Sequence, residues 1–172
     1  MDSNKLELVT SFFVPSKPKP KPRMTRRDKW AKRDIVMSYR AWEDLVALMW
    51  KIHKKNIKLH DVADYTFEAI GIGIDFYMPG VPRGDLDNYQ KGIFEALSKA
   101  RVVKDDRSKY IVFSDRLTAY NICNDCKDYK NKEKCHGVTR CDKGGANIYI
   151  YRPKWERDER WRAGLLLALK EK

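Results

Sequence analysis

Residues 84–110 read GDLDNYQKGIFEALSKARVVKDDRSKY, a stretch that holds four aspartates around one predicted helix. Its middle repeats apolar side chains at intervals of three and four, which predicts a helix with one buried face. That face consists of Leu86, Ile93, Phe94 and Leu97. Aspartates stand at both ends of the predicted helix, so the stretch combines a core-forming face with a concentration of negative charge.

The aspartates form two pairs that we expect to meet in space. Asp85 and Asp87 are two residues apart, so in an extended or capping segment they point to the same side. Asp105 and Asp106 follow the helix, in the turn that leads to the next strand. A returning strand can bring that turn beside the strand that precedes the helix. The sequence therefore predicts that the two pairs converge.

Converging carboxylates repel one another unless a cation is present. Mg²⁺ (or Mn²⁺) is the expected ion, because hard divalent ions prefer carboxylate, water and phosphate oxygens, and pairs of such ions stabilise an in-line phosphoryl displacement. Lys91 lies one turn after Asp87 and could contact the scissile phosphate as a point charge. The alternative is that Asp85 and Asp87 only cap the helix and that the second pair is ordinary turn chemistry.

A basic arm follows the first predicted strand. Residues 15–34 read PSKPKPKPRMTRRDKWAKRD, in which prolines alternate with lysines. The pattern is typical of an extended, polyproline-like segment without a core of its own. We expect this arm to lie along a phosphate backbone, and a flexible linker is the alternative. The side chains expected to contact DNA are Lys19, Lys21, Arg23, Arg26 and Arg27.

The other segments complete an α/β pattern in a single domain, residues 1–172. Strands are predicted at residues 5–14, 65–79, 109–122 and 146–153. Helices are predicted at residues 38–55 and 154–172, besides the helix within 84–110. The first helix has Ser38 as a candidate N-cap, and its apolar stripe is Trp42, Leu45, Val46, Met49 and Ile52. This order predicts a small mixed β-sheet covered by helices.

The composition indicates the partner and the compartment. Among 172 residues, 36 Lys+Arg stand against 24 Asp+Glu, a formal net charge of +12, which favours a polyanionic partner. Nucleic acid is the common case, and an anionic membrane surface is the alternative. No run approaches the roughly 20 apolar residues of a membrane span, and the first residues lack a signal-peptide pattern. We expect a cytoplasmic protein whose four cysteines are thiols or metal ligands.

All four cysteines lie in a polar segment, residues 123–145, that we interpret as an inserted loop. The candidate ligands are Cys123, Cys126, Cys135 and Cys141. The first two have knuckle spacing, and the segment has almost no apolar residues to fold it by burial. Zn²⁺ held by four thiolates would fold it, so the sequence predicts a structural zinc site. His136 could replace one ligand; free thiols and two disulfides are the alternatives.

Residues 85–112 resemble the central motif of the RusA-type Holliday junction resolvases. The motif is Asp-x-Asp-Asn, a lysine three residues after the Asn, a helix ending in a small-residue turn, and an Asp-Asp pair, and this sequence matches its spacing without gaps. The upstream PSKPKPKPRMTRR is similar to the family's basic Pro/Arg segment, whereas the cysteine loop departs from its pattern. The resemblance implies a small α/β homodimer that cleaves branched DNA with Mg²⁺, in the cytosol of a bacterium or of a phage-infected host.

The resemblance also implies individual roles. The family's metal-binding acids and essential lysine match Asp85, Asp87, Asp106 and Lys91. Supporting positions match Asn88, Glu95 and Asp105. The asparagine is expected to orient an acid or cap the helix, and the glutamate, which stands where many relatives have Asp, is expected to lie outside the ring of metal ligands.

The leading hypothesis is a Mg²⁺-dependent endodeoxyribonuclease that resolves Holliday junctions by paired symmetric nicks during DNA recombination and repair. A four-way junction has two-fold character, so two nicks need two symmetric active sites and hence a homodimer. One alternative is a non-catalytic, zinc-stabilised DNA-binding module in which the aspartates only cap. Another is a nuclease of the same fold that acts on other branched DNA.

Overall fold

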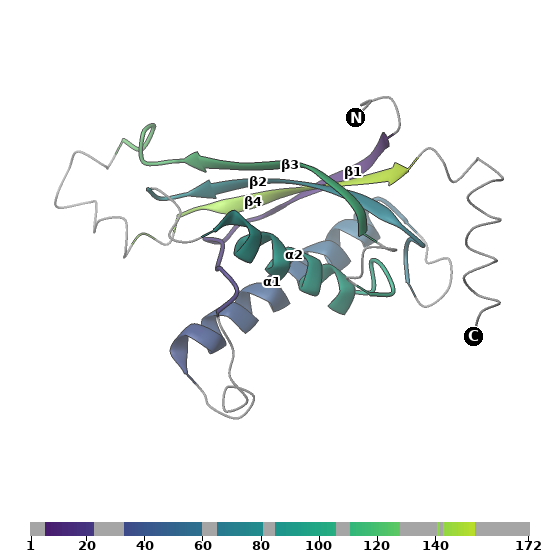
Figure 1. Ribbon diagram of the computed structural model, residues 1–172, viewed down its shortest axis with the longest axis horizontal. Helices are drawn as coiled ribbons and strands as arrows, with labels where there is room; N and C mark the ends of the chain where they lie inside the picture. The colour runs from purple at the N-terminus through teal and green to yellow at the C-terminus, as the bar shows by residue number, and fades with distance from the viewer. Residues whose placement is uncertain are drawn as a thin grey trace.

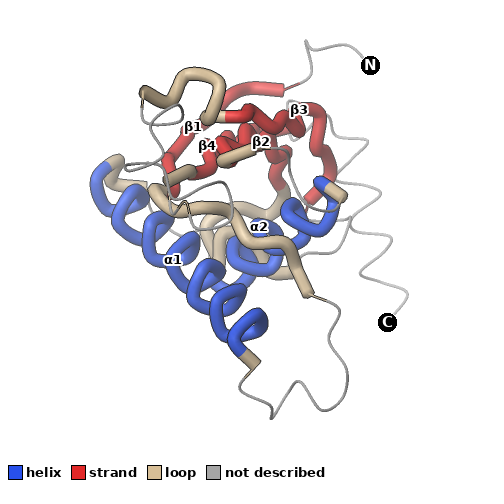
Figure 2. Tube along the Cα trace, turned by 90° about the vertical axis from the view of Figure 1, so that its left-hand side faces the viewer, coloured by secondary structure: helices blue, strands red, loops and turns tan. Residues whose placement is uncertain are grey.

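A four-stranded mixed sheet carries two helices on one of its faces (Figures 1 and 2). The computed structural model describes residues 6–22, 33–59, 65–80, 85–105, 111–127, 141 and 143–153. The elements are β1 (Leu6–Val14), α1 (Asp34–Asn56), β2 (Ile70–Met78), α2 (Leu86–Lys99), β3 (Ile111–Asn121) and β4 (Gly145–Pro153). The strand order is β1-β4-β2-β3, with β2 and β3 parallel and the other neighbours antiparallel. The predicted α/β class and mixed sheet are confirmed; the helix predicted at 154–172 lies outside the described residues.

β2 lies inside the sheet, and its residues alternate between the two faces. The side chains that enter the core beneath the helices are Ile70, Ile72, Ile74, Phe76 and Met78. This strand begins later than the predicted range 65–79, because the N–H groups of Thr66 and Phe67 donate to the carbonyls of Arg101 and Val102, at 2.9 and 2.8 Å. Residues 65–67 are therefore joined to the turn after α2.

α1 begins earlier than predicted and buries a different set of side chains. Its N-cap is Arg33, whereas the hydroxyl of Ser38 donates to the carbonyl of Ile35, so the prediction of Ser38 as N-cap is wrong. Trp42 and Val46 enter the core as expected, and Trp50 joins them. Ile52, predicted on the stripe, is 46% exposed. Within the described residues, neither helix combines the length and apolar character needed to cross a bilayer.

An ion pair between a buried acid and an exposed arginine lies on the face of the sheet opposite the core. The carboxylate of Asp75, on β2, is 1% exposed and accepts hydrogen bonds from the Nε and Nη2 atoms of Arg116 at 2.8 and 2.5 Å. The hydroxyl of Tyr149 donates to the same carboxylate at 3.1 Å, and the guanidinium lies 4.7 Å from the centre of that tyrosine's ring. Because these partners satisfy the buried acid, we interpret it as a structural ion pair.

Candidate active site

α2 starts directly at the first predicted acid. Asp85 is the N-cap residue, with extended backbone angles (φ −70°, ψ 137°), yet its side chain makes no capping hydrogen bond to the helix. Asp87 lies in the first turn, and both side chains are exposed. The alternative in which Asp85 serves as a side-chain cap is therefore wrong, and its carboxylate is open to a ligand from solvent.

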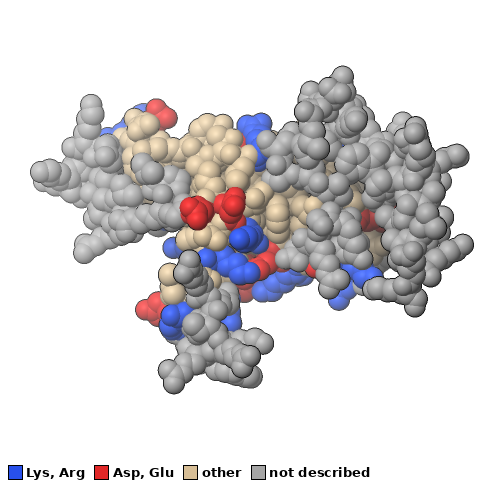
Figure 3. All heavy atoms as spheres, in the orientation of Figure 1, with Lys and Arg blue, Asp and Glu red and all other residues tan. Residues whose placement is uncertain are grey.

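Lys91 is exposed on the next turn of α2, four residues after Asp87. Residues four apart on a helix are neighbours on its surface, so Lys91 and Asp87 lie on the same face of α2. Figure 3 shows acidic side chains at the level of α2, directly above a band of Lys and Arg side chains on the same face of the molecule. This combination can hold a cation and a phosphate side by side.

The basic arm is docked onto α2 rather than free. The backbone N–H of Lys21 donates to the carbonyl of Asn88 at 2.9 Å, and its ammonium forms an ion pair with Glu95. Pro18 is buried and Lys19 is half-buried. Lys21 therefore holds the arm against α2, and its predicted role as a phosphate contact stays a prediction. The predicted DNA contacts Arg23, Arg26 and Arg27 lie outside the described residues.

Glu95 anchors the arm because it is itself held in place. The hydroxyl of Tyr39, on α1, donates to its carboxylate at 2.8 Å. Burial alone would raise the pKa of Glu95, but the hydrogen bonds from Lys21 and Tyr39 outweigh burial and lower it. Burial raises the pKa of the neighbouring Glu43 to about 7. At mildly acidic pH, Glu43 therefore carries a proton, and Glu95, which binds the arm, carries the negative charge.

The proton on Glu43 makes the free energy of unfolding depend on pH. The folded state binds it more tightly than the unfolded chain does, so the wild type loses stability as the pH rises from about 4.5 to about 7. Glu43→Gln mimics the protonated form and should gain about 1–2 kcal/mol in free energy of unfolding relative to wild type between pH 5.5 and pH 8, after allowance for partial exposure. Urea denaturation at both pH values measures it, with the exposed Glu7→Gln as control. Parallel profiles for Glu43→Gln and wild type would contradict the assignment.

The second acidic pair lies at the other end of α2. Asp105 follows the helix, on the side where β3 begins at Ile111, paired with Ile70 of β2. Asp85 follows the opposite end of β2, and Figure 1 shows α2 running along the sheet between them. The 14 residues of α2 span roughly 20 Å. The expectation that Asp105 returns beside Asp85 within one chain is therefore wrong.

The physical reason is the direction of β3. For β3 to run parallel to β2, the chain must first cross back to the end of the sheet where β2 begins, and here α2 makes that crossover. Asp106 lies outside the described residues, so its role stays a prediction. Among the described residues, no group of three or more His, Cys, Asp or Glu side chains is placed to hold a metal ion.

The cysteines are only partly described. Cys123 is buried just after β3, where a tight turn brings the N–H of Cys126 to its carbonyl at 3.4 Å. Cys126 and Cys141 are half-buried, and these three are free of disulfides. Cys135 and His136 lie outside the described residues. The zinc site thus stays a prediction at this point.

The comparison with known families agrees with this geometry. The family model described as endodeoxyribonuclease RusA matches residues 14–120, more than half of the 172 residues. The match covers the arm, both helices, β2 and nearly all of β3. No curated protein matches the chain. Since the matched region contains the exposed acids and Lys91, the protein belongs to the RusA family of endodeoxyribonucleases, which act on Holliday junctions.

Proposed function

We propose that this protein is a homodimeric, Mg²⁺-dependent endonuclease that resolves Holliday junctions by paired symmetric nicks during DNA recombination and repair, in the cytosol of a bacterium or a phage-infected host. The observation that carries the proposal is the exposed pair Asp85 and Asp87 at the start of α2, with Lys91 one turn on, in a RusA-family chain of net charge +12. Endonucleases of this family generally depend on a divalent metal ion.

The donor set fits a hard divalent ion. Asp85 and Asp87 offer carboxylate oxygens as ligands, because both side chains are exposed and that of Asp85 makes no capping bond to α2. A bound Mg²⁺ would supply charge stabilisation and an activated water for hydrolysis of the phosphodiester. Lys91 would hold a phosphate oxygen beside the carboxylates and offset part of their negative charge. Asn88 fixes the arm through its carbonyl.

We further propose that each active site is completed by a second copy of the chain. One chain keeps Asp105 roughly 20 Å from Asp85, at the far end of α2. In a two-fold dimer with antiparallel α2 helices, the acidic turn of one protomer would come beside the helix start of the other. Asp106 of the partner subunit would then join Asp85 and Asp87, and symmetry would give two such sites. That number suits the two nicks that resolve a junction.

The arm would bring DNA to this site. Lys21 and Glu95 hold its extended segment against α2, next to the helix start. The basic residues that follow, Arg23, Arg26 and Arg27, would neutralise phosphates near the cut, and Lys19 would do so from the docked part. The arm therefore positions a phosphate-binding strip relative to the carboxylates.

Cleavage of defined substrates tests the proposal. A synthetic four-way junction, a flapped duplex and a linear duplex are incubated with the full chain in Mg²⁺, in Mn²⁺ and in chelator. We expect symmetric nicks on the junction that require the metal, and little cutting of the linear duplex. Binding without any cleavage would favour the DNA-binding module instead. Equal cleavage of the flap would favour a nuclease of the same fold with broader substrates.

We propose that the cysteine loop binds one structural Zn²⁺ through Cys123, Cys126, Cys135 and Cys141. The first two cysteines lie in one tight turn, in which the N–H of Cys126 donates to the carbonyl of Cys123, and this supports a shared site for their thiolates. Zinc analysis of the purified chain should find about one ion per chain, and Cys126→Ser should lose most of it. Asn124→Ala, in the same turn, should keep it. A wild-type chain without zinc and with four titratable thiols would contradict the assignment.

A further inference from the structure

Three aromatic side chains form a row on the face of the sheet opposite α1 and α2 (Figure 2). The neighbours of Phe13 and Tyr77 along their strands enter the core, so these two rings lie on the opposite face. Tyr120, on the edge strand β3, is paired with Tyr77 in register. The rings of Tyr77 and Tyr120 stack, with centroids 5.3 Å apart and planes at 17°, and Phe13 meets Tyr77 edge-on at 6.3 Å. These three residues are here called the aromatic row.

Both ends of the aromatic row are open to solvent. Phe13 is 45% exposed and Tyr120 is 43% exposed, whereas Tyr77 is half-buried between them. Among the described strands none lies beyond β3, so no neighbouring strand covers the outer side of Tyr120. Aromatic rings that are exposed side by side mark a binding surface more often than a structural one.

Two glycines at the start of β4 make room for the row. A Cβ atom on Gly145 would overlap the ring of Phe13, so that ring lies directly on the backbone of β4. A Cβ atom on Gly144, which has φ 138°, would lie 2.7 Å from the carbonyl oxygen of Tyr77 and 3.3 Å from the Cα atom of Lys17. The lack of side chains at both positions therefore lets the row and the start of the basic arm approach each other.

The aromatic row lies at the end of the sheet where α2 begins. β1, β2 and β3 all end there, since they run in the same direction (Figure 1). The basic arm begins two residues after Phe13, Asp85 follows the end of β2, and Cys123 comes three residues after Tyr120. The segments predicted to meet DNA or to bind metal therefore leave the sheet beside the row.

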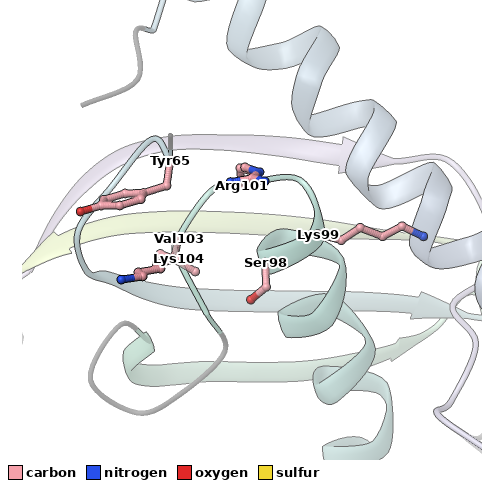
Figure 4. Close-up of a pocket in the computed structure, with 6 residues that line it drawn as sticks. All are labelled: Tyr65, Ser98, Lys99, Arg101, Val103 and Lys104. Carbon is pink, nitrogen blue, oxygen red and sulfur yellow. The ribbon is translucent and has the colours of Figure 1, made fainter. Parts of the chain in front are cut away.

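The opposite end of the sheet offers a different chemistry. A cavity of about 450 Å³ lies there, after α2, and its lining residues are Tyr65, Ser98, Lys99, Arg101, Val103 and Lys104 (Figure 4). Among the described residues that line it, one is aromatic, Tyr65. Figure 4 shows Lys99 turned towards α1, where its ammonium pairs with Asp44. This cavity thus provides no surface of stacked rings, unlike the end near Asp85.

The ligand that fits such a surface in a DNA-binding protein is an unpaired nucleobase. Every base has a flat π-face, so bases stack on exposed aromatic rings whatever the sequence. Charge on this face does not oppose DNA, because the carboxylate of Asp75 is neutralised by Arg116, whose guanidinium also hydrogen-bonds the side chain of Tyr120. The arm that begins beside Phe13 adds lysines, and the whole chain has a net charge of +12.

We propose that the aromatic row is a stacking platform for unpaired bases of the DNA junction, with the outer face of Tyr120 receiving the first base. The inference rests on the proposed function and deepens it, because it names the part of the substrate that this face binds. Base pairs that flank the exchange point of a four-way junction can open at a cost of a few kcal/mol. Stacking on the row would offset that cost and hold the junction open without reading its sequence.

Tyr120→Leu tests the proposal by removing the ring from an exposed site. The Kd for a labelled four-way junction, measured by fluorescence anisotropy in chelator, should rise about tenfold. The slope of log Kd against log salt should stay unchanged, because no phosphate contact is lost. Tyr120→Phe keeps the ring and loses only the hydroxyl that bonds Arg116, so it should bind like wild type. Leu8→Ala is the control, since Leu8 is a 54% exposed apolar residue at the other end of β1.

Photo-crosslinking locates the stacked base. Junctions that carry 5-iododeoxyuridine at single positions next to the exchange point are irradiated with the full chain, and mass spectrometry identifies the linked residue. We expect linkage to Tyr120 from at least one of these positions, and its loss in Tyr120→Leu. Linkage that is equally strong from positions deep in the duplex arms would show that the row contacts paired DNA, and would contradict the proposal.

Other outcomes overturn the proposal in distinguishable ways. If Tyr120→Leu and Phe13→Leu bind like wild type while the wild type binds and cuts junctions, the aromatic row has no role in binding and the proposed function stands. If sedimentation without DNA shows that Tyr120→Leu turns a dimer into a monomer, the row is an interface between copies of the chain. If the wild type neither binds nor cuts junctions, the proposed function and this inference fail together.

Discussion

Asp85→Asn should lower the rate of junction cleavage by at least about a thousandfold and leave junction binding intact or tighter. Asparagine keeps the shape of the side chain and removes the charge that a divalent ion needs. Because Asp85 makes no side-chain capping bond, the change should not weaken α2. Loss of one negative charge also lessens repulsion of the phosphate backbone. Asp87→Asn should behave in the same way.

Single-turnover cleavage in Mg²⁺, anisotropy in chelator and thermal melting measure the three quantities separately. Asp34→Asn is a matched control, since Asp34 is an exposed acid in the first turn of α1, as Asp87 is in α2. This control should cut at the wild-type rate. A wild-type rate in Asp85→Asn as well would mean that the acids at the start of α2 are not metal ligands. Loss of binding along with cleavage would point to a structural role.

Mixing two inactive variants should restore activity. Subunits carrying Asp85→Asn combine with subunits carrying Asp106→Asn to form heterodimers in which one composite site receives both damaged residues and the other receives neither. Random pairing gives half heterodimers with one intact site each, so nicking should recover to about a quarter of the wild-type rate. Each heterodimer has one working site, so the main product should be a junction nicked in one strand.

A mixture of Asp85→Asn with Asp87→Asn supplies the control. Both residues come from the start of the same α2, so every composite site in that heterodimer carries damage and the mixture should stay inactive. Subunits with different affinity tags allow the heterodimer to be purified and its formation to be verified. An inactive heterodimer of Asp85→Asn with Asp106→Asn would show that the acids come together within one chain, in conflict with the position of Asp105 along α2.

Local pattern was enough to predict the elements, because apolar spacing is a property of neighbouring residues. The apolar face of α2 and the buried residues of β2 follow directly from periods of 3.6 and 2. Trp50 lies four residues after Val46 and fits the same stripe, so the signal for it was present in the sequence. Ile52 was assigned to the core although its position on α1 faces solvent.

Features that depend on the path of the chain could not be predicted in this way. The distance between Asp85 and Asp105 depends on whether β3 runs parallel to β2, and residue spacing in one sequence does not give that direction. The ion pair between Lys21 and Glu95 joins residues 74 positions apart. The sequence predicts only a phosphate contact for Lys21, and its role in fixing the arm on α2 is hidden. The partnership of Asp75 with Arg116 is hidden for the same reason.

The place of β4 has a consequence for how the molecule is assembled during synthesis. β4 is the last strand along the chain, yet it lies between β1 and β2, and β1 touches the sheet only through it among the described strands. A nascent chain that has emerged as far as β3 therefore has an N-terminal strand that can pack on α1, as Phe12 does on Trp50, but has no strand to pair with. The native sheet can form only after the cysteine loop has left the ribosome, because β4 follows that loop. The length of the loop therefore affects how fast β4 inserts between β1 and β2.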